Sequence, residues 1–168
     1  MRAVYKCATL LMVGFAGFQF GSCSSGGNNC FPAGTKVQTL SGEVNIESIK
    51  IGDEVLGYDF ATGKVTPVHV TRTYVHHHDA TLISIALPEL PTIEITPEHP
   101  LFSVSRNTWI TAGALAAGEQ IQQLSTKDKV ASVVISSVSE HANTADVFNF
   151  ETDVTGNYFV GGVLAKYY

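Results

Sequence analysis

The sequence is poor in charged residues and has no basic cluster. Only 15% of its 168 residues are charged, and the formal net charge is -5 with a pI near 5.6. No stretch interleaves lysine or arginine with aromatic side chains, which is the pattern typical of nucleic-acid-binding surfaces. We therefore expect no nucleic-acid partner. The chain is long enough, and at 45% hydrophobic apolar enough, for one domain with its own core.

A sustained helical period is also lacking. The chain instead carries short apolar or alternating segments rich in β-branched residues, which indicate strands. These segments are 65–75, 81–87, 92–96, 130–138, 147–150 and 158–164. Turn residues separate the segments, at 41–42, 61–63, 88–91 and 153–157. The pattern predicts an all-β domain built from many short strands.

The only long uncharged apolar run, at 7–20, is too short to cross a bilayer as a stable anchor. It predicts a signal peptide at 1–22, and Phe20-Gly21-Ser22-Cys23 resembles the lipobox of bacterial lipoproteins. Cys23 would be the lipidated residue and 23–29 a flexible tether. We expect an exported, membrane-anchored lipoprotein of the bacterial cell envelope. A lipobox usually has leucine where Phe20 stands, so simple secretion and an uncleaved anchor remain alternatives.

Cysteine is scarce, with three in the chain. Cys7 would leave with the signal peptide and Cys23 would carry the lipid, so Cys30 would be the one free thiol. An unpaired cysteine in an oxidising compartment is a liability or a reactive group. A Cys23–Cys30 disulfide is the alternative, although it would close only a very small loop. The count favours a chemical role for Cys30.

The position of Cys30 directly after Asn29 suggests a bond that the protein cuts itself. The thiol can attack the neighbouring Asn29 carbonyl if another group protonates the departing nitrogen, and histidine suits that task near neutral pH. His99, in the run Thr96-Pro97-Glu98-His99, is the candidate proton donor. The alternative interpretation is a proline-bracketed turn in which Thr96 caps locally and His99 packs as a neutral core residue.

The strand-rich region contains an internal repeat with a separation of about 65 residues. Ile49–Val55 returns as Leu115–Ile121, and Lys64–His76 returns as Lys129–His141. The repeat predicts two similar β subdomains related by a pseudo-two-fold axis. A chance pairing of strand-like segments is the alternative.

The two copies diverge where chemistry would lie. Thr96 and His99 of one copy fall opposite Gly161 and Leu164 of the other. Polar, titratable residues in one copy and apolar ones in the other are what a single active site on a duplicated scaffold would produce.

Five sequence blocks, in order along the chain, resemble those of a Hint domain, the module shared by Hedgehog autoprocessing domains, inteins and bacterial intein-like or pretoxin Hint domains. The blocks are 30–35, 46–56, 96–102, Trp109 with 112–121, and 158–164. The resemblance implies a Hint autoprocessing domain over 30–168. It also implies the Hint fold, with two pseudo-two-fold-related β subdomains.

The resemblance implies specific roles for residues at the scissile bond. Cys30 would attack the Asn29 carbonyl in an N-to-S acyl shift, and Thr96 and His99 would bind and protonate the scissile nitrogen. The product would be a thioester between Asn29 and Cys30. No cofactor or metal is implied.

Asp79 stands at a place that resembles the one where Hedgehog domains keep an aspartate that activates the incoming alcohol, and the resemblance implies that role for it. The histidine run before it offers two other interpretations. One is a solvated hairpin end, and the other is a metal site formed by His76 and His78 on one face.

The chain ends in Lys166-Tyr167-Tyr168 where splicing inteins have His-Asn. We therefore expect a single-turnover self-cleavage without splicing, with the N-terminal segment as substrate and water, a thiol, an amine or an alcohol as acceptor. Membrane attachment through the lipid would precede cleavage. Alternatives are a degenerate Hint module that binds a partner, an unrelated β-rich surface lipoprotein and a papain-like cysteine hydrolase.

Overall fold

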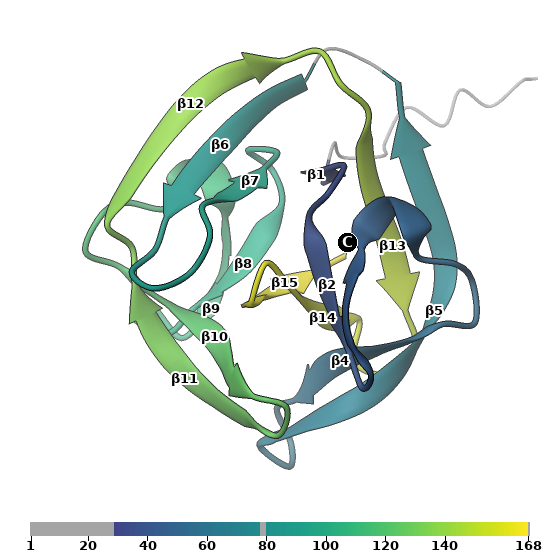
Figure 1. Ribbon diagram of the computed structural model, residues 1–168. Helices are drawn as coiled ribbons and strands as arrows, with labels where there is room; N and C mark the ends of the chain where they lie inside the picture. Colours follow the sequence, from purple (N-terminus) through teal and green to yellow (C-terminus); the bar gives the residue numbers. More distant parts are fainter. Residues whose placement is uncertain (1–28, 78–79, 168) are drawn as a thin grey trace, which may run out of the picture.

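The fold is described by a computed structural model over residues 29–77 and 80–167 (Figure 1). Within these ranges the chain forms strands and two short 3-10 turns, with no α-helix. No helix long and apolar enough to span a bilayer occurs in this part of the chain. The predicted signal peptide at 1–22, Cys23 and Asp79 lie outside the described residues. The predicted all-β class is confirmed.

The strands are short and are joined mainly by turns. Their bounds are β1 Phe31–Pro32, β2 Lys36–Thr39, β3 Gly42–Asn45, β4 Glu54–Asp59, β5 Lys64–His76, β6 Ala80–Ala86, β7 Ile93–Ile95, β8 Pro100–Ser103, β9 Thr108–Thr111, β10 Gln120–Thr126, β11 Lys129–Val134, β12 Ser137–Asn143, β13 Val147–Thr152, β14 Asn157–Val160 and β15 Val163–Lys166. The 3-10 turns are η1 Ile46–Ser48 and η2 Ala112–Ala114.

Three sheets build the domain. One has the strand order β1-β13-β5-β4, a second runs β11-β10-β8-β15-β14-β2-β3 with β9 paired to β8, and a third is β12-β6-β7. Figure 1 shows β5 with β13 and β12 with β6 as two long curved arms on opposite sides of the central strands.

The predicted internal repeat is visible in the backbone hydrogen bonds. The Gly52 N–H donates to Val70 at 2.8 Å, and the Gly118 N–H donates to Ile135 at 2.8 Å. Both glycines have positive φ, 92° and 89°, which an L side chain would strain. Each long arm pairs strands from the two copies. β5 of the first copy pairs with β13 of the second, and β12 of the second copy pairs with β6 of the first. This exchange ties the two copies into one unit.

Two predicted strands differ from the observed ones. Segment 158–164 is a hairpin, since Gly161 and Gly162 take φ values of 58° and 81° and reverse the chain between β14 and β15. Segment 130–138 is split into β11 and β12, which belong to different sheets. Gly161-Gly162 is a hairpin signal in its own right, whereas no glycine or proline marks the break between β11 and β12.

The core gathers the inward side chains of all three sheets. Its largest fully buried members include Phe31, Phe150, Tyr158 and Phe159. The rings of Phe150 and Tyr158 lie 4.1 Å apart between centroids. Phe31, near the start of the described chain, belongs to the same core cluster as Phe150 and Tyr158.

Candidate active site at the Asn29–Cys30 bond

The peptide bond between Asn29 and Cys30 is buried. Asn29 is 7% exposed and Cys30 is 1% exposed. β1 follows immediately and pairs with β13, Phe31 lying opposite Phe148. Cys30 packs with Leu82 and Val147. The bond is therefore held inside the fold.

Thr96, the residue after β7, contacts the peptide groups of Cys30. The Cys30 N–H donates to Thr96 Oγ1 at 2.8 Å, and the Thr96 N–H donates to the Cys30 carbonyl at 3.0 Å. The Thr96 hydroxyl also lies 3.2 Å from that carbonyl oxygen, to which it donates. The nitrogen of the candidate scissile bond thus meets the hydroxyl expected from the sequence.

His99 lies on the same turn and is completely buried. Its ring packs against Phe31 in a tilted arrangement with centroids 4.4 Å apart, and Nε2 lies 3.4 Å from the Tyr158 hydroxyl. Burial lowers the pKa of His99 to about 3, and the nearby Asn29 backbone partly opposes that shift. Nδ1 has no hydrogen-bond partner in the described structure. The imidazole is therefore neutral at pH 7, beside the scissile peptide and with one nitrogen unengaged.

Asn149 on β13 is a site residue that the sequence analysis did not predict. Its Nδ2 donates to the Asn29 carbonyl oxygen, the oxygen of the candidate scissile bond. Its Oδ1 accepts from the Tyr158 hydroxyl and from the Phe150 N–H. With both ends of the carboxamide engaged, the donor is fixed in place, as an oxyanion-stabilising group must be.

A signal for Asn149 was present in the sequence. It is the polar residue in the apolar strand Val147-Phe148-Asn149-Phe150, and it is 3% exposed. A buried polar side chain in a strand needs a partner. In the sequence, Tyr158 stands out only as part of the family block 158–164. Burial raises its pKa, which keeps the phenol protonated as a donor to Asn149.

The Cys30 thiol is protonated in this environment. Burial raises the pKa of Cys30 to about 12. Since the thiolate is the nucleophile, attack requires a base to take the thiol proton. At pH 7 the thiol of Cys30 is protonated and the imidazole of His99 is neutral, so both side chains are uncharged before any reaction.

Asp79, Cys23 and His78 lie outside the described residues, so their predicted roles are untested. His77, which lies between the two histidines of the metal-site alternative, His76 and His78, has its Nδ1 2.9 Å from Asp146 Oδ1 at the surface. In the described parts of the chain, no group of three or more histidine, cysteine, aspartate or glutamate side chains could hold a metal ion.

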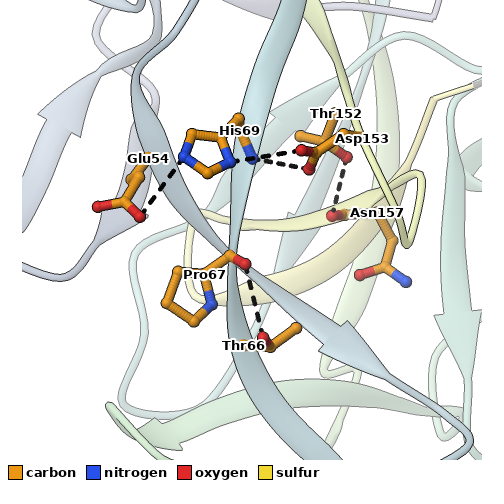
Figure 2. Close-up of polar contacts among 7 residues, drawn as sticks. All are labelled: Glu54, Thr66, Pro67, His69, Thr152, Asp153 and Asn157. Atoms are coloured by element: carbon orange, nitrogen blue, oxygen red, sulfur yellow. Dashed lines mark hydrogen bonds and ion pairs between the residues drawn. The ribbon is translucent and has the colours of Figure 1, made fainter.

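A second polar cluster fixes the turn that joins β13 to β14. Figure 2 shows the His69 ring between two carboxylates, with Nε2 3.6 Å from Glu54 and Nδ1 3.3 Å from Asp153. Asp153 Oδ1 also accepts the His69 N–H at 2.8 Å. Thr152 donates to the Asn157 carbonyl at 3.3 Å. The cluster anchors the ends of the strands that carry Asn149 and Tyr158.

The chain is similar to a known domain family and to several solved structures. Residues 36–167 match the family model for the pretoxin HINT domain, a range that begins after Cys30. The solution structure of a bacterial intein-like domain from Clostridium thermocellum is 28% identical, with a TM-score of 0.70 over 82% of this chain and 97% of that one. A DnaX mini intein from Spirulina platensis, 17% identical, shares the fold, with a TM-score of 0.70 over 82% of this chain and 98% of its own.

One curated relative is an iron-sulfur cluster assembly SufBD family protein of Mycobacterium tuberculosis, 37% identical over 81 residues. That match covers 46% of this chain but only 9% of the relative, so the chain spans less than a tenth of that protein's length. The family model, in contrast, covers most of the chain. The protein belongs to the pretoxin Hint domain family, and its Hint fold is one that supports autoprocessing.

Proposed function

We propose that the domain cleaves its own chain between Asn29 and Cys30. Cys30 Sγ attacks the Asn29 carbonyl carbon, the C–N bond breaks, and a thioester replaces the amide. The observation that supports this most is the set of contacts on that one bond. Asn149 donates to its carbonyl oxygen and Thr96 accepts from its N–H. An amide is a poor electrophile with a poor leaving group, so polarisation of the oxygen and protonation of the nitrogen are the two demands on the site.

The proton can move within the site. His99 takes the thiol proton as Sγ attacks and then delivers it to the departing nitrogen of Cys30. The neutral ring and the protonated thiol are the starting states that this transfer needs. No proton is exchanged with solvent in the step, which is consistent with a centre where His99 is 0% exposed and Thr96 is 1% exposed.

The thioester is then resolved by water or by an external thiol, amine or alcohol, in a single turnover and without splicing. Asp79 would activate an incoming alcohol, on the basis of the family resemblance alone. Asn and His of the splicing tail are replaced by Tyr167 and Lys166. Neither side chain can cyclise as asparagine does.

The N-terminal sequence suggests where the reaction takes place. If 1–22 is removed and Cys23 lipidated, cleavage would leave a lipidated fragment 23–29 and free the domain 30–168 from the membrane. Supporting this is the apolar run followed by the lipobox-like segment.

A catalytically degenerate Hint domain that acts as a binding module is the second candidate. The strongly raised pKa of Cys30 favours it, because a thiol held protonated is a poor nucleophile without an effective base.

Intact mass distinguishes the two. The full chain and Cys30→Ala are each incubated with and without dithiothreitol or hydroxylamine. Breakage between Asn29 and Cys30 that the nucleophile accelerates and Cys30→Ala abolishes supports the thioester. A parent chain that stays whole under all conditions would leave the binding module as the better interpretation.

A further inference from the structure

The side chain of Asn29 is a buried group that the proposed cleavage does not use. Asn29 is 7% exposed, and its Oδ1 is buried without a hydrogen-bond partner in the described structure. Buried polar atoms are normally paired, and an unpaired one in a native fold calls for an explanation such as a catalytic role. This carboxamide belongs to the residue whose own carbonyl would become the thioester.

The backbone carbonyl of Asn29 is fixed while its side chain is not held through Oδ1. Asn149 Nδ2 holds the carbonyl oxygen. Cys30 N–H, on the other side of the bond, is held by Thr96 at 2.8 Å. Rotation that brings the Asn29 carboxamide toward its own carbonyl carbon therefore breaks no hydrogen bond at Oδ1.

Solvent is poorly placed to resolve a thioester here. Cys30 is 1% exposed, and the groups beside it, Thr96 and His99, are 1% and 0% exposed. An internal nucleophile in the same residue needs no entry path, and well-oriented intramolecular groups react as if present at effective concentrations of about 10⁵ M or more. Asparagine can close a five-membered imide ring on its own carbonyl.

We propose that the Asn29 carboxamide resolves the thioester, an inference that rests on the proposed acyl shift. Nδ2 bonds to the Asn29 carbonyl carbon, the bond from that carbon to Cys30 Sγ breaks, and the electron pair leaves with sulfur. The Cys30 α-amine freed in the acyl shift takes the proton from Nδ2. The N-terminal fragment then ends in an aminosuccinimide, and no water is consumed.

Asn29 thus has two roles. Its carbonyl carbon is the electrophile in both steps, and its carboxamide nitrogen is the nucleophile that breaks the thioester. Asn149 continues to polarise the same carbonyl oxygen in the second step, as the thioester retains that oxygen. External thiols would compete with the ring closure and accelerate release, as in the proposed function.

The test uses the full chain made in a cell-free system without added thiol and quenched in acid, with mass spectrometry of the released N-terminal fragment. The parent fragment should be one water molecule lighter than the free acid. At neutral pH it should open to a mixture of asparagine and isoasparagine C-termini. A fragment with the free-acid mass from the start and only ordinary asparagine would overturn the proposal.

Variants separate this proposal from the acyl shift itself. Asn29→Ala should lose release without added thiol but still be cleaved by dithiothreitol, and Asn29→Gln, which must close a six-membered ring, should resemble it. Release from Asn29→Ala at the parent rate refutes this proposal alone. An imide fragment from Cys30→Ala would show ring closure without a thioester, and it would contradict the proposed function as well. If dithiothreitol cleaves neither the parent nor the variants, the proposed function fails and the inference fails with it.

Discussion

The buried imidazole of His99 should make the fold lose stability as the pH falls. The ring is 0% exposed, and burial lowers its pKa from 6.5 to about 3. Between these values the unfolded chain holds a proton on this residue that the folded chain does not. The free energy of unfolding should therefore drop by about 1.4 kcal/mol for each pH unit below 6.5, and by at most about 5 kcal/mol over the whole interval. Above pH 6.5 this contribution is fully present.

The assay compares two proteins that differ only at this residue. Both carry Cys30→Ala so that the chain stays whole, and one also carries His99→Gln. Urea denaturation is measured at several values between about pH 7.5 and about pH 4.5. Other titrating groups affect both proteins alike, so the difference in slope reports His99.

The protein that keeps His99 should lose about 1.4 kcal/mol per pH unit more than the His99→Gln protein below pH 6. Parallel curves would show that the imidazole is not held neutral in the fold. The proton relay through His99 would then lose its main support.

The remaining predictions concern the reaction and the strands that position it. Because neither His99 nor Cys30 titrates between about pH 5 and about pH 8, the cleavage rate at saturating nucleophile should be flat over that range, and a midpoint near pH 6.5 would contradict this. Thr96→Val removes the acceptor of the Cys30 N–H and should slow dithiothreitol-induced cleavage at least about tenfold, which gel densitometry can follow; an unchanged rate would remove Thr96 from the mechanism. Asn149→Ala should slow cleavage by about 10²–10³, the loss typical of an oxyanion donor, and a rate within a few-fold of the parent in the folded variant would refute that role. Asp153→Ala should lower the free energy of unfolding by about 0.5–1.5 kcal/mol in urea without changing the cleavage chemistry, whereas an unchanged stability would show that the Figure 2 cluster does not anchor β13.

Local patterns were sufficient for much of the fold. Alternation and turn residues predicted β5 and β6 nearly to their ends, because a half-buried strand imposes a period of two on its own sequence. The repeat could also be recognised from local sequence, because each copy needs glycine at the same positive-φ turn, at Gly52 and Gly118. The prediction of one strand over 158–164 was wrong because it gave the apolar residues more weight than Gly161-Gly162, which is a local hairpin signal.

The candidate site was only half predictable. Thr96 and His99 could be found because they form a local motif on one turn, close enough in sequence for a pattern to show. Asn149 could not be placed beside Asn29, since the two residues are 120 positions apart and meet only because β13 pairs with β1. The local sequence does not predict a contact that forms only when two distant strands pair in a sheet.

The sequence by itself determined the all-β class, the duplication and the identity of Cys30, Thr96 and His99 as candidates, because strand periodicity, turn chemistry and short motifs are local properties of the chain. The tertiary structure alone decided that Asn149 holds the Asn29 carbonyl, that the arms exchange partners and that His99 is neutral. Burial and long-range pairing depend on the whole fold, and these set the protonation states from which any reaction at Cys30 must start.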